Sequence, residues 1–215
     1  MKNILKDSKP AVIAVDLHRG HLDPEVATMP IPADRVDHVI KENERFFNKC
    51  RELGIPIIHQ LTLYRNKDEI LSNPYWRETS GDPTKPRKRV AEHQLADGPG
   101  VEVMPTLIKE GDYVVDTKKR YNCFLRTDLE FLLNSLEVDT LLVTGVNTNS
   151  CVLATSIDGN NRDFKVIVNE DCVDSIDGKE AHENALQMIR LAFGWTATTD
   201  EIVEALNENL KLTKA

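Results

Sequence analysis

Short apolar runs rich in β-branched residues alternate along the chain with longer segments in which apolar residues recur at helical spacing. The runs have the length and composition of buried parallel strands, and the segments between them have the period of amphipathic helices. The predicted strands are Ala11–Val15, Pro56–Leu61, Tyr113–Thr117, Val138–Thr144, Phe164–Val168 and the short Trp195–Thr198. The predicted helices are Ala33–Leu53, Thr127–Leu136, Cys151–Asn160, Lys179–Phe193 and Thr199–Leu210. This order predicts an α/β fold, a doubly wound, mostly parallel six-stranded sheet with helices on both faces.

The stretch from about residue 64 to residue 111 interrupts this rhythm. It is dense in proline and glycine, and long irregular segments of compact domains are usually functional loops or lids. Tyr75 and Trp76 lie within it and form either an apolar wall over a pocket or an anchor to the core. No internal repeat and no long linker divides the chain. We therefore expect residues 1–215 to form a single domain with a lid-like segment at 64–111.

The composition limits the class of protein. Of the 215 residues, 40% are hydrophobic and 29% are charged, as in globular proteins. The net charge of −8 argues against nucleic acid as the main partner. No apolar run approaches the roughly 20 residues of a membrane helix, and the N-terminal residues lack the apolar core of a signal peptide. The four cysteines form no C-x-x-C pair, so we expect free thiols and a cytoplasmic location.

The stretch Leu141–Thr155 has the sequence LLVTGVNTNSCVLAT. An apolar run ends at Gly145, a short polar turn follows, and Cys151 opens a segment of helical spacing. A thiol in the first turn of a helix faces unpaired backbone N–H groups and the positive end of the helix dipole. We therefore expect a lowered pKa at Cys151 and N–H groups placed to hold an oxyanion. The alternative is a small hydrophobic residue packed under the sheet.

Two further polar residues follow predicted strands. Asp16 comes directly after the first strand, and Lys118 comes directly after the third. Because the carboxyl ends of parallel strands meet at one edge of a sheet, these side chains and Cys151 are expected to converge. A carboxylate base, a cation and a thiol together can carry out acyl transfer, with attack on an amide, loss of an amine and hydrolysis of a thioester.

These motifs resemble those of the isochorismatase-like cysteine hydrolases. The resemblance runs from about residue 11 to residue 171 and rests on Asp16, on Lys118 with Phe124 and Thr127-Asp-Leu129, and on Thr144-Gly-Val-Asn-Thr-Asn-Ser-Cys-Val-Leu-Ala-Thr155. It implies a catalytic triad of Asp16, Lys118 and Cys151. It also implies a cis peptide bond between Val146 and Asn147, and an oxyanion hole made by the backbone amides of Asn147 and Cys151. Lys119 competes with Lys118 for the role of the cation.

The resemblance also bears on metals and cofactors. Nicotinamidases of the family carry a metal site built on a D-x-H motif after the second strand, and this chain has His59-Gln-Leu-Thr-Leu-Tyr64 there. We therefore expect no metal and no other cofactor. The remaining route to a metal would be an approach of His18, His21 and His59 to one another.

The resulting prediction is a cysteine-dependent amidohydrolase that cleaves a C–N bond of a small polar amide, ureide or carbamoyl compound and releases ammonia or an amine. The alternatives are a nicotinamidase-type amidase and a non-catalytic, flavodoxin-like small-molecule-binding module. By resemblance the protein forms a homo-oligomer, a dimer or a tetramer. Six side chains are candidates for substrate contact: His18, Arg19, Tyr75, Trp76, Asn122 and Phe124. Arg19 would bind either a substrate carboxylate or an internal acid, and His18 either substrate or a backbone carbonyl.

Overall fold

A parallel sheet forms the centre of the computed structural model, which describes residues 1–213. All of its strand pairs are parallel, in the order β3-β2-β1-β4-β5-β6. The strands are β1 (Pro10–Val15), β2 (Ile57–Thr62), β3 (Tyr113–Lys118), β4 (Thr140–Val146), β5 (Lys165–Asp174) and β6 (Trp195–Ala197). The predicted α/β class is thus confirmed. The chain order reverses between β1 and β4, and such a switch point opens a crevice at the carboxyl ends of the strands.

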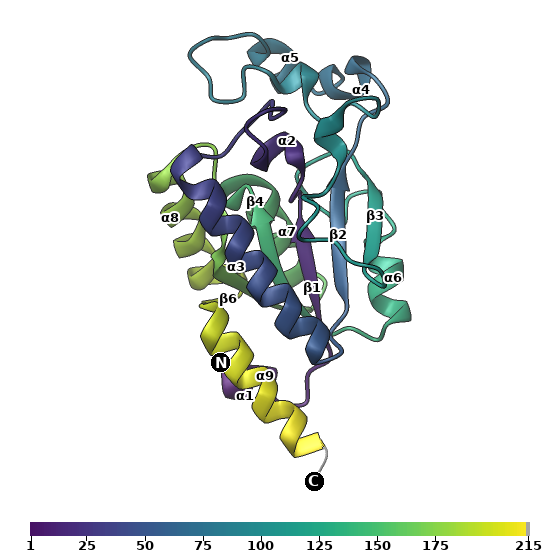
Figure 1. Ribbon diagram of the computed structural model, residues 1–215, viewed down its shortest axis with the longest axis vertical. Helices are drawn as coiled ribbons and strands as arrows, with labels where there is room; N and C mark the ends of the chain where they lie inside the picture. The colour runs from purple at the N-terminus through teal and green to yellow at the C-terminus, as the bar shows by residue number, and fades with distance from the viewer. Residues whose placement is uncertain (214–215) are drawn as a thin grey trace.

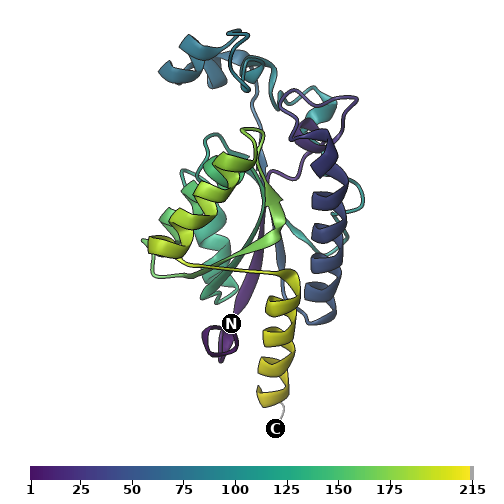
Figure 2. The ribbon, with the colours of Figure 1, turned by 90° about the vertical axis from the view of Figure 1, so that its left-hand side faces the viewer.

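Helices cover both faces of the sheet (Figure 2). The helices described are α1 (Lys2–Leu5), α2 (Arg19–Leu22), α3 (Ala33–Glu52), α4 (Lys67–Leu71), α5 (Pro74–Thr79), α6 (Leu129–Ser135), α7 (Leu153–Asn160), α8 (Lys179–Met188) and α9 (Thr199–Thr213). Figure 1 shows α4 and α5 at the end of the molecule opposite α1 and α9. The 64–111 segment therefore has local helical structure, which its proline and glycine content did not predict.

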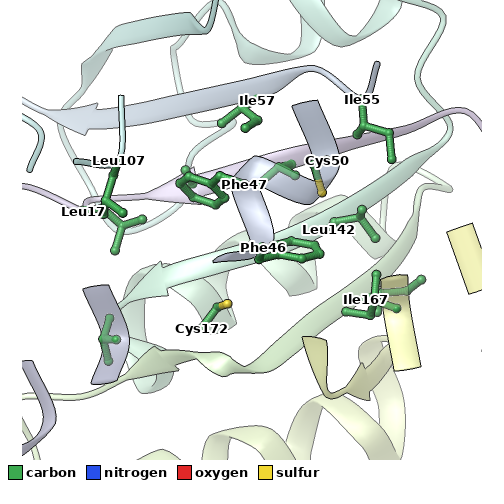
Figure 3. Packing of buried hydrophobic residues seen from close by; sticks show 14 of the residues in the cluster. Leu17, Phe46, Phe47, Cys50, Ile55, Ile57, Leu107, Leu142, Ile167 and Cys172 are labelled. Atoms are coloured by element: carbon green, nitrogen blue, oxygen red, sulfur yellow. The ribbon is translucent and has the colours of Figure 1, made fainter. Parts of the chain in front are cut away.

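Two apolar cores hold these layers together. In the first, Phe46, Phe47 and Cys50 of α3 pack against the sheet, where they meet Leu142 and Ile167 (Figure 3). All five side chains are fully buried. On the other face, a second cluster joins alternate residues of the same strands to α6, α7 and α8. Burial on both faces explains why the central strands are continuous apolar runs.

Gly145 allows β4 to lie close to β1 at their carboxyl ends. Its φ is +101°, a region that residues with a side chain rarely adopt. A Cβ atom there would lie 2.0 Å from the carbonyl oxygen of Val15, a distance that no packing tolerates. The glycine thus brings the turn after β4 beside the residue that follows β1, Asp16.

The chain leaves β4 through a π-helical turn, Thr148–Val152, and α7 begins only at Leu153. The expected α-helix start at Cys151 is therefore wrong by two residues. Within the part of the chain described, no helix is both long and apolar enough to cross a membrane.

Candidate active site

Three strand ends bring Asp16, Lys118 and Cys151 together. The Nζ atom of Lys118 lies 2.5 Å from Oδ2 of Asp16 and 3.5 Å from Sγ of Cys151. It also donates to Oγ1 of Thr62, the last residue of β2, at 2.6 Å. The exposed fractions are 1% for Asp16, 0% for Lys118 and 5% for Cys151. Bulk water is therefore largely excluded from the three groups, which strengthens their mutual interactions.

The contacts of Lys118 and Lys119 show which of the two lysines belongs to the site. The Nζ atom of Lys119 donates to the carbonyl of Leu63 and lies 3.5 Å from Glu69. Its side chain is about one-third exposed, whereas that of Lys118 is buried. Lys118 is therefore the lysine that reaches Asp16 and the thiol.

Asp16 and Lys118 form a buried ion pair. Burial alone would raise the pKa of Asp16, but the positive charge of Lys118 holds this pKa well below its usual value. Burial alone would lower the pKa of Lys118, but the negative charge of Asp16 raises it instead. Asp16 also accepts a hydrogen bond from the backbone N–H of Thr62 at 2.9 Å. The carboxylate at the edge of the sheet thus stays ionised and is held in a fixed position.

The thiol of Cys151 differs from the expectation. Burial raises its pKa to about 11; Lys118 opposes this shift, while the charge and hydrogen bond of Asp16 add to it. The predicted lowering of the pKa is therefore wrong, because Cys151 lies in a buried π-helical turn next to a carboxylate. At neutral pH the site holds a protonated thiol beside an ionised acid.

The turn before Cys151 is fixed by its own polar groups. The peptide bond between Val146 and Asn147 is cis. The side-chain oxygen of Asn147 accepts a hydrogen bond from the backbone N–H of Ile176 at 2.8 Å. Its carbonyl accepts from the N–H groups of Ser150 and Val152, both at 3.1 Å. Asn147 is buried, so the turn is ordered against the loop that follows β5.

A cavity of about 400 Å³, including its open mouth, lies over these groups. Its wall is formed by Asp16, His21, Met29, Thr62, Tyr64, Trp76, Arg87, Val90, His93, Lys118, Arg120, Tyr121, Asn147 and Cys151. Of the six candidates for substrate contact, Trp76 alone belongs to this wall.

Tyr75 and Trp76 are neighbours with different environments. Tyr75 is 63% exposed and lies outside the cavity wall, whereas Trp76 is 5% exposed. Nε1 of Trp76 donates to the hydroxyl of Tyr121 at 3.0 Å. In a helix, adjacent residues face different directions, and so α5 turns one of the two aromatic rings to the cavity and the other to solvent.

His18 and Arg19 make internal contacts. Nδ1 of His18 lies 2.7 Å from the carbonyl oxygen of Val101, and Nε2 accepts from the backbone N–H of Thr62 at 3.1 Å. A carbonyl only accepts and a backbone N–H only donates, so Nδ1 of His18 carries the proton. Arg19 pairs with Asp23 at 2.8 Å and Glu102 at 2.9 Å. Of the alternatives left open by the sequence, His18 thus contacts a backbone carbonyl and Arg19 pairs with internal acids.

Asn122 and Phe124 do not belong to the cavity wall. Nδ2 of Asn122 donates to Asp158 at 2.6 Å, and its Oδ1 caps the N–H of Phe124 at 2.8 Å. The ring of Phe124 is 4% exposed and stacks on Phe164. Both side chains thus make their contacts within the protein, and their contact with substrate stays a prediction.

The three histidines considered for a metal point to different partners. His18 faces Val101, and Nδ1 of His21 lies 2.7 Å from the carbonyl of Met29. Nε2 of His59 lies 3.2 Å from Oδ2 of Asp112. Among residues 1–213, no group of three or more His, Cys, Asp or Glu side chains has an arrangement that could hold a metal ion.

Several cavity residues were missed by the sequence analysis. Thr62 directly follows the predicted strand Pro56–Leu61, so the rule that identified Asp16 and Lys118 also applies to it. Arg87, Val90 and His93 come from the 64–111 segment, whose path depends on tertiary contacts. Tyr121 follows the third strand and carried no local signal of its own.

The sequence profile of the isochorismatase domain matches residues 10–201. The chain therefore belongs to the isochorismatase family. It is a hydrolase of that family, as the resemblance of its motifs predicted.

Similar proteins extend this assignment. An N-carbamoylsarcosine amidase from an Arthrobacter species is 28% identical over 202 residues, which cover 93% of this chain and 72% of the relative. A ureidoacrylate amidohydrolase from Methylobacterium radiotolerans is 32% identical over 136 residues, which cover 62% of this chain and 53% of that protein's length. A cysteine hydrolase from Pseudomonas syringae pv. phaseolicola superposes with a TM-score of 0.80 at 24% identity, covering 94% of this chain and 93% of the other. This last comparison confirms the fold.

Proposed function

We propose that the protein is a cysteine-dependent amidohydrolase that cleaves a C–N bond of a small amide, ureide or carbamoyl compound. The observation that carries this proposal is the contact of one buried lysine with both a buried carboxylate and a buried thiol at the floor of a small cavity. The relatives named N-carbamoylsarcosine amidase and ureidoacrylate amidohydrolase support the substrate class.

Asp16 is the base in the proposed first step. The thiol proton passes to the Asp16 carboxylate as Sγ of Cys151 attacks the substrate carbonyl carbon. Burial raises the pKa of the resting thiol to about 11, so the proposed proton transfer accompanies the attack. The ammonium group of Lys118, 3.5 Å from Sγ, offsets the negative charge that develops on sulfur.

The carbonyl oxygen becomes an oxyanion in this step. The backbone N–H groups of Asn147 and Cys151, on either side of the turn after β4, are the proposed donors to it. Collapse of the tetrahedral intermediate breaks the C–N bond. The proton held by Asp16 then moves to the departing nitrogen, which leaves as ammonia or an amine, and a thioester remains on Cys151.

In the hydrolysis of the thioester, Asp16 again acts as the proposed base. Asp16 takes a proton from water as the oxygen attacks the thioester carbon, and the C–S bond then breaks. The proton returns to sulfur, so that the acid product and the starting thiol are formed. The sum of both steps is an amide and water converted to an acid and an amine, which needs no redox partner.

Ammonia release from a panel of substrates tests the proposal. The panel contains N-carbamoylsarcosine, ureidoacrylate, biuret and nicotinamide, and it is run with the wild type, Cys151→Ala and Cys50→Ala. Cys50 is a fully buried thiol of the first apolar core and provides the matched control. We expect release that requires Cys151 and survives Cys50→Ala, with an acyl adduct on Cys151 detectable by mass spectrometry after rapid acid quenching.

Two results would contradict the proposal. Release by Cys151→Ala at the wild-type rate would remove the thiol from the mechanism. If the wild type released no ammonia from any compound of the panel but bound the same compounds saturably, a small-molecule-binding module would be favoured.

A further inference from the structure

One wall of the cavity is a stack of two aromatic rings and two guanidinium groups, Arg120, Trp76, Tyr121 and Arg87, which we call the guanidinium wall. Cζ of Arg120 lies 5.0 Å from the centre of the Trp76 ring, and Cζ of Arg87 lies 5.5 Å from the centre of the Tyr121 ring. The two rings meet at 5.4 Å in an edge-on contact. Because cation–π contacts fix a guanidinium over a ring face, the stack presents two ordered cations.

The charges around the cavity do not balance. Asp16 is the one carboxylate of the cavity wall among the residues that the structure describes, and Lys118 neutralises it. Arg87 is compensated by Asp177 from behind the wall, at 2.5 Å. Arg120 forms no ion pair within 4.0 Å in residues 1–213. The cavity therefore has an excess of one positive charge, which Arg120 supplies.

Neutral oxygens hold the Arg120 side chain in place. Its Nη1 donates to the carbonyl of Lys119 at 2.6 Å and to that of Glu69 at 3.3 Å, and its Nη2 donates to the hydroxyl of Ser72 at 2.8 Å. These bonds fix the guanidinium at the cavity wall and leave its charge uncompensated. A cation that is positioned in advance loses little entropy when an anion binds.

We propose that the guanidinium wall binds a carboxylate of the substrate, with Arg120 as the residue that determines this specificity. The inference rests on the proposed function of the same cavity and narrows its substrate class to an amide or ureide that carries a carboxylate. Guanidinium groups match the planar, two-oxygen geometry of a carboxylate better than ammonium groups do. Lys118 is already paired with Asp16, so it does not compete for the substrate carboxylate.

A pair of nearly isosteric ureides tests this inference. N-carbamoylglycine carries a carboxylate, and N-carbamoylglycinamide carries an uncharged amide in its place. We expect wild-type kcat/KM to be about 10- to 100-fold higher for the acid, the range of a charge-assisted hydrogen bond. In Arg120→Gln the ratio should fall to about one, through a higher KM for the acid.

Arg126→Gln is the matched control. Arg126 lies six residues further along the chain, is exposed and is not part of the cavity wall. Arg126→Gln removes the same unit of charge near the same strand end and should leave the acid-to-amide ratio of kcat/KM unchanged. A loss of discrimination in both variants would mean that net charge alone is measured, and that result would overturn the role of Arg120.

Binding to Cys151→Ala separates this inference from the proposed function. Calorimetric titration with the two ureides needs no turnover. We expect the acid to bind at least about tenfold more tightly than the amide, and Arg120→Gln in the Cys151→Ala background to remove the difference. Equal binding of both ureides, no saturable binding of the acid, or an unchanged preference in Arg120→Gln would each overturn the inference, whatever the turnover assays show.

Discussion

The cavity has two walls of different origin. One consists of Asp16, Thr62 and Lys118 at strand ends and of Cys151 in the π-helical turn that follows β4. The other contains Trp76, Arg87, Val90 and His93 of the 64–111 segment, together with Tyr121 and Arg120. In the first wall, Nζ of Lys118 lies 2.5 Å from Asp16 and 3.5 Å from Cys151, whereas the second wall presents rings and guanidinium groups. Changes in the strand-end wall should therefore act on the chemical step, and changes in the second wall on substrate affinity.

The largest effect is expected from Asp16→Asn. Loss of the proposed base should lower kcat by about 10²- to 10⁴-fold, the usual contribution of general-base catalysis. The same change should lower the pKa of Cys151 below its wild-type value of about 11, because the negative charge of Asp16 raises it. Turnover assays measure kcat, and the pH dependence of thiol alkylation measures the pKa of Cys151. A more acidic thiol with intact turnover would contradict the role of Asp16 as the base.

Lys118→Met should reduce stability as well as turnover. It leaves the carboxylate of Asp16 buried without its partner, at a cost of about 3–5 kcal/mol in the free energy of unfolding. Lys119→Met provides the control, since the Lys119 side chain is one-third exposed and its ion pair with Glu69 is 3.5 Å long. We expect the control to change stability by less than about 1 kcal/mol. Equal losses in urea titrations of the two variants would refute the assignment of the buried pair to Lys118.

His21 should make stability depend on pH. Burial lowers its pKa from 6.5 to about 4. Between these values the unfolded chain binds a proton that the folded chain does not, so stability is complete above pH 6.5 and is lost as the pH falls toward 4. The shift corresponds to about 3 kcal/mol, to which His93 adds in the same direction.

Urea titrations of His21→Asn across this pH range measure that contribution. The variant should show a shallower loss of stability than the wild type, while His38→Asn on the exposed face of α3 should match the wild type. An unaltered slope in His21→Asn would show that His21 takes up its proton in the folded state.

The smallest effect is expected from Trp76→Phe. The change removes the 3.0 Å hydrogen bond to Tyr121 and the larger ring beneath Arg120, and such losses amount to about 1 kcal/mol. KM should rise roughly fivefold with kcat little changed, whereas Tyr75→Phe should leave both constants at their wild-type values because Tyr75 faces solvent. A fall in kcat without a change in KM would show that the two walls do not divide binding from chemistry.

The same division explains what could be read from the sequence. Apolar runs predicted the strands, helical spacing predicted the helices, and the rule that parallel strand ends meet placed Asp16, Lys118 and Cys151 at one edge of the sheet. The pKa of Cys151 could not be predicted, because it depends on burial and on a carboxylate 135 positions away in the chain. The second wall was not predicted either. Whether α5 turns Tyr75 or Trp76 inward is set by packing against Tyr121, which no local pattern of residues encodes.

Gly145 has a consequence for how the chain tolerates substitution. Any other residue there would place its Cβ atom 2.0 Å from the carbonyl oxygen of Val15, so the two central strands would have to separate where they support Asp16 and Cys151. A library randomised at this codon and selected for turnover should return glycine alone. A library at Gly111, where nothing lies within 4 Å of the added atom, should also return asparagine and aspartate, the residues that best accept a positive φ. Replacing one hydrogen atom with a methyl group at Gly145 would thus increase the distance between the carboxylate of Asp16 and the thiol of Cys151.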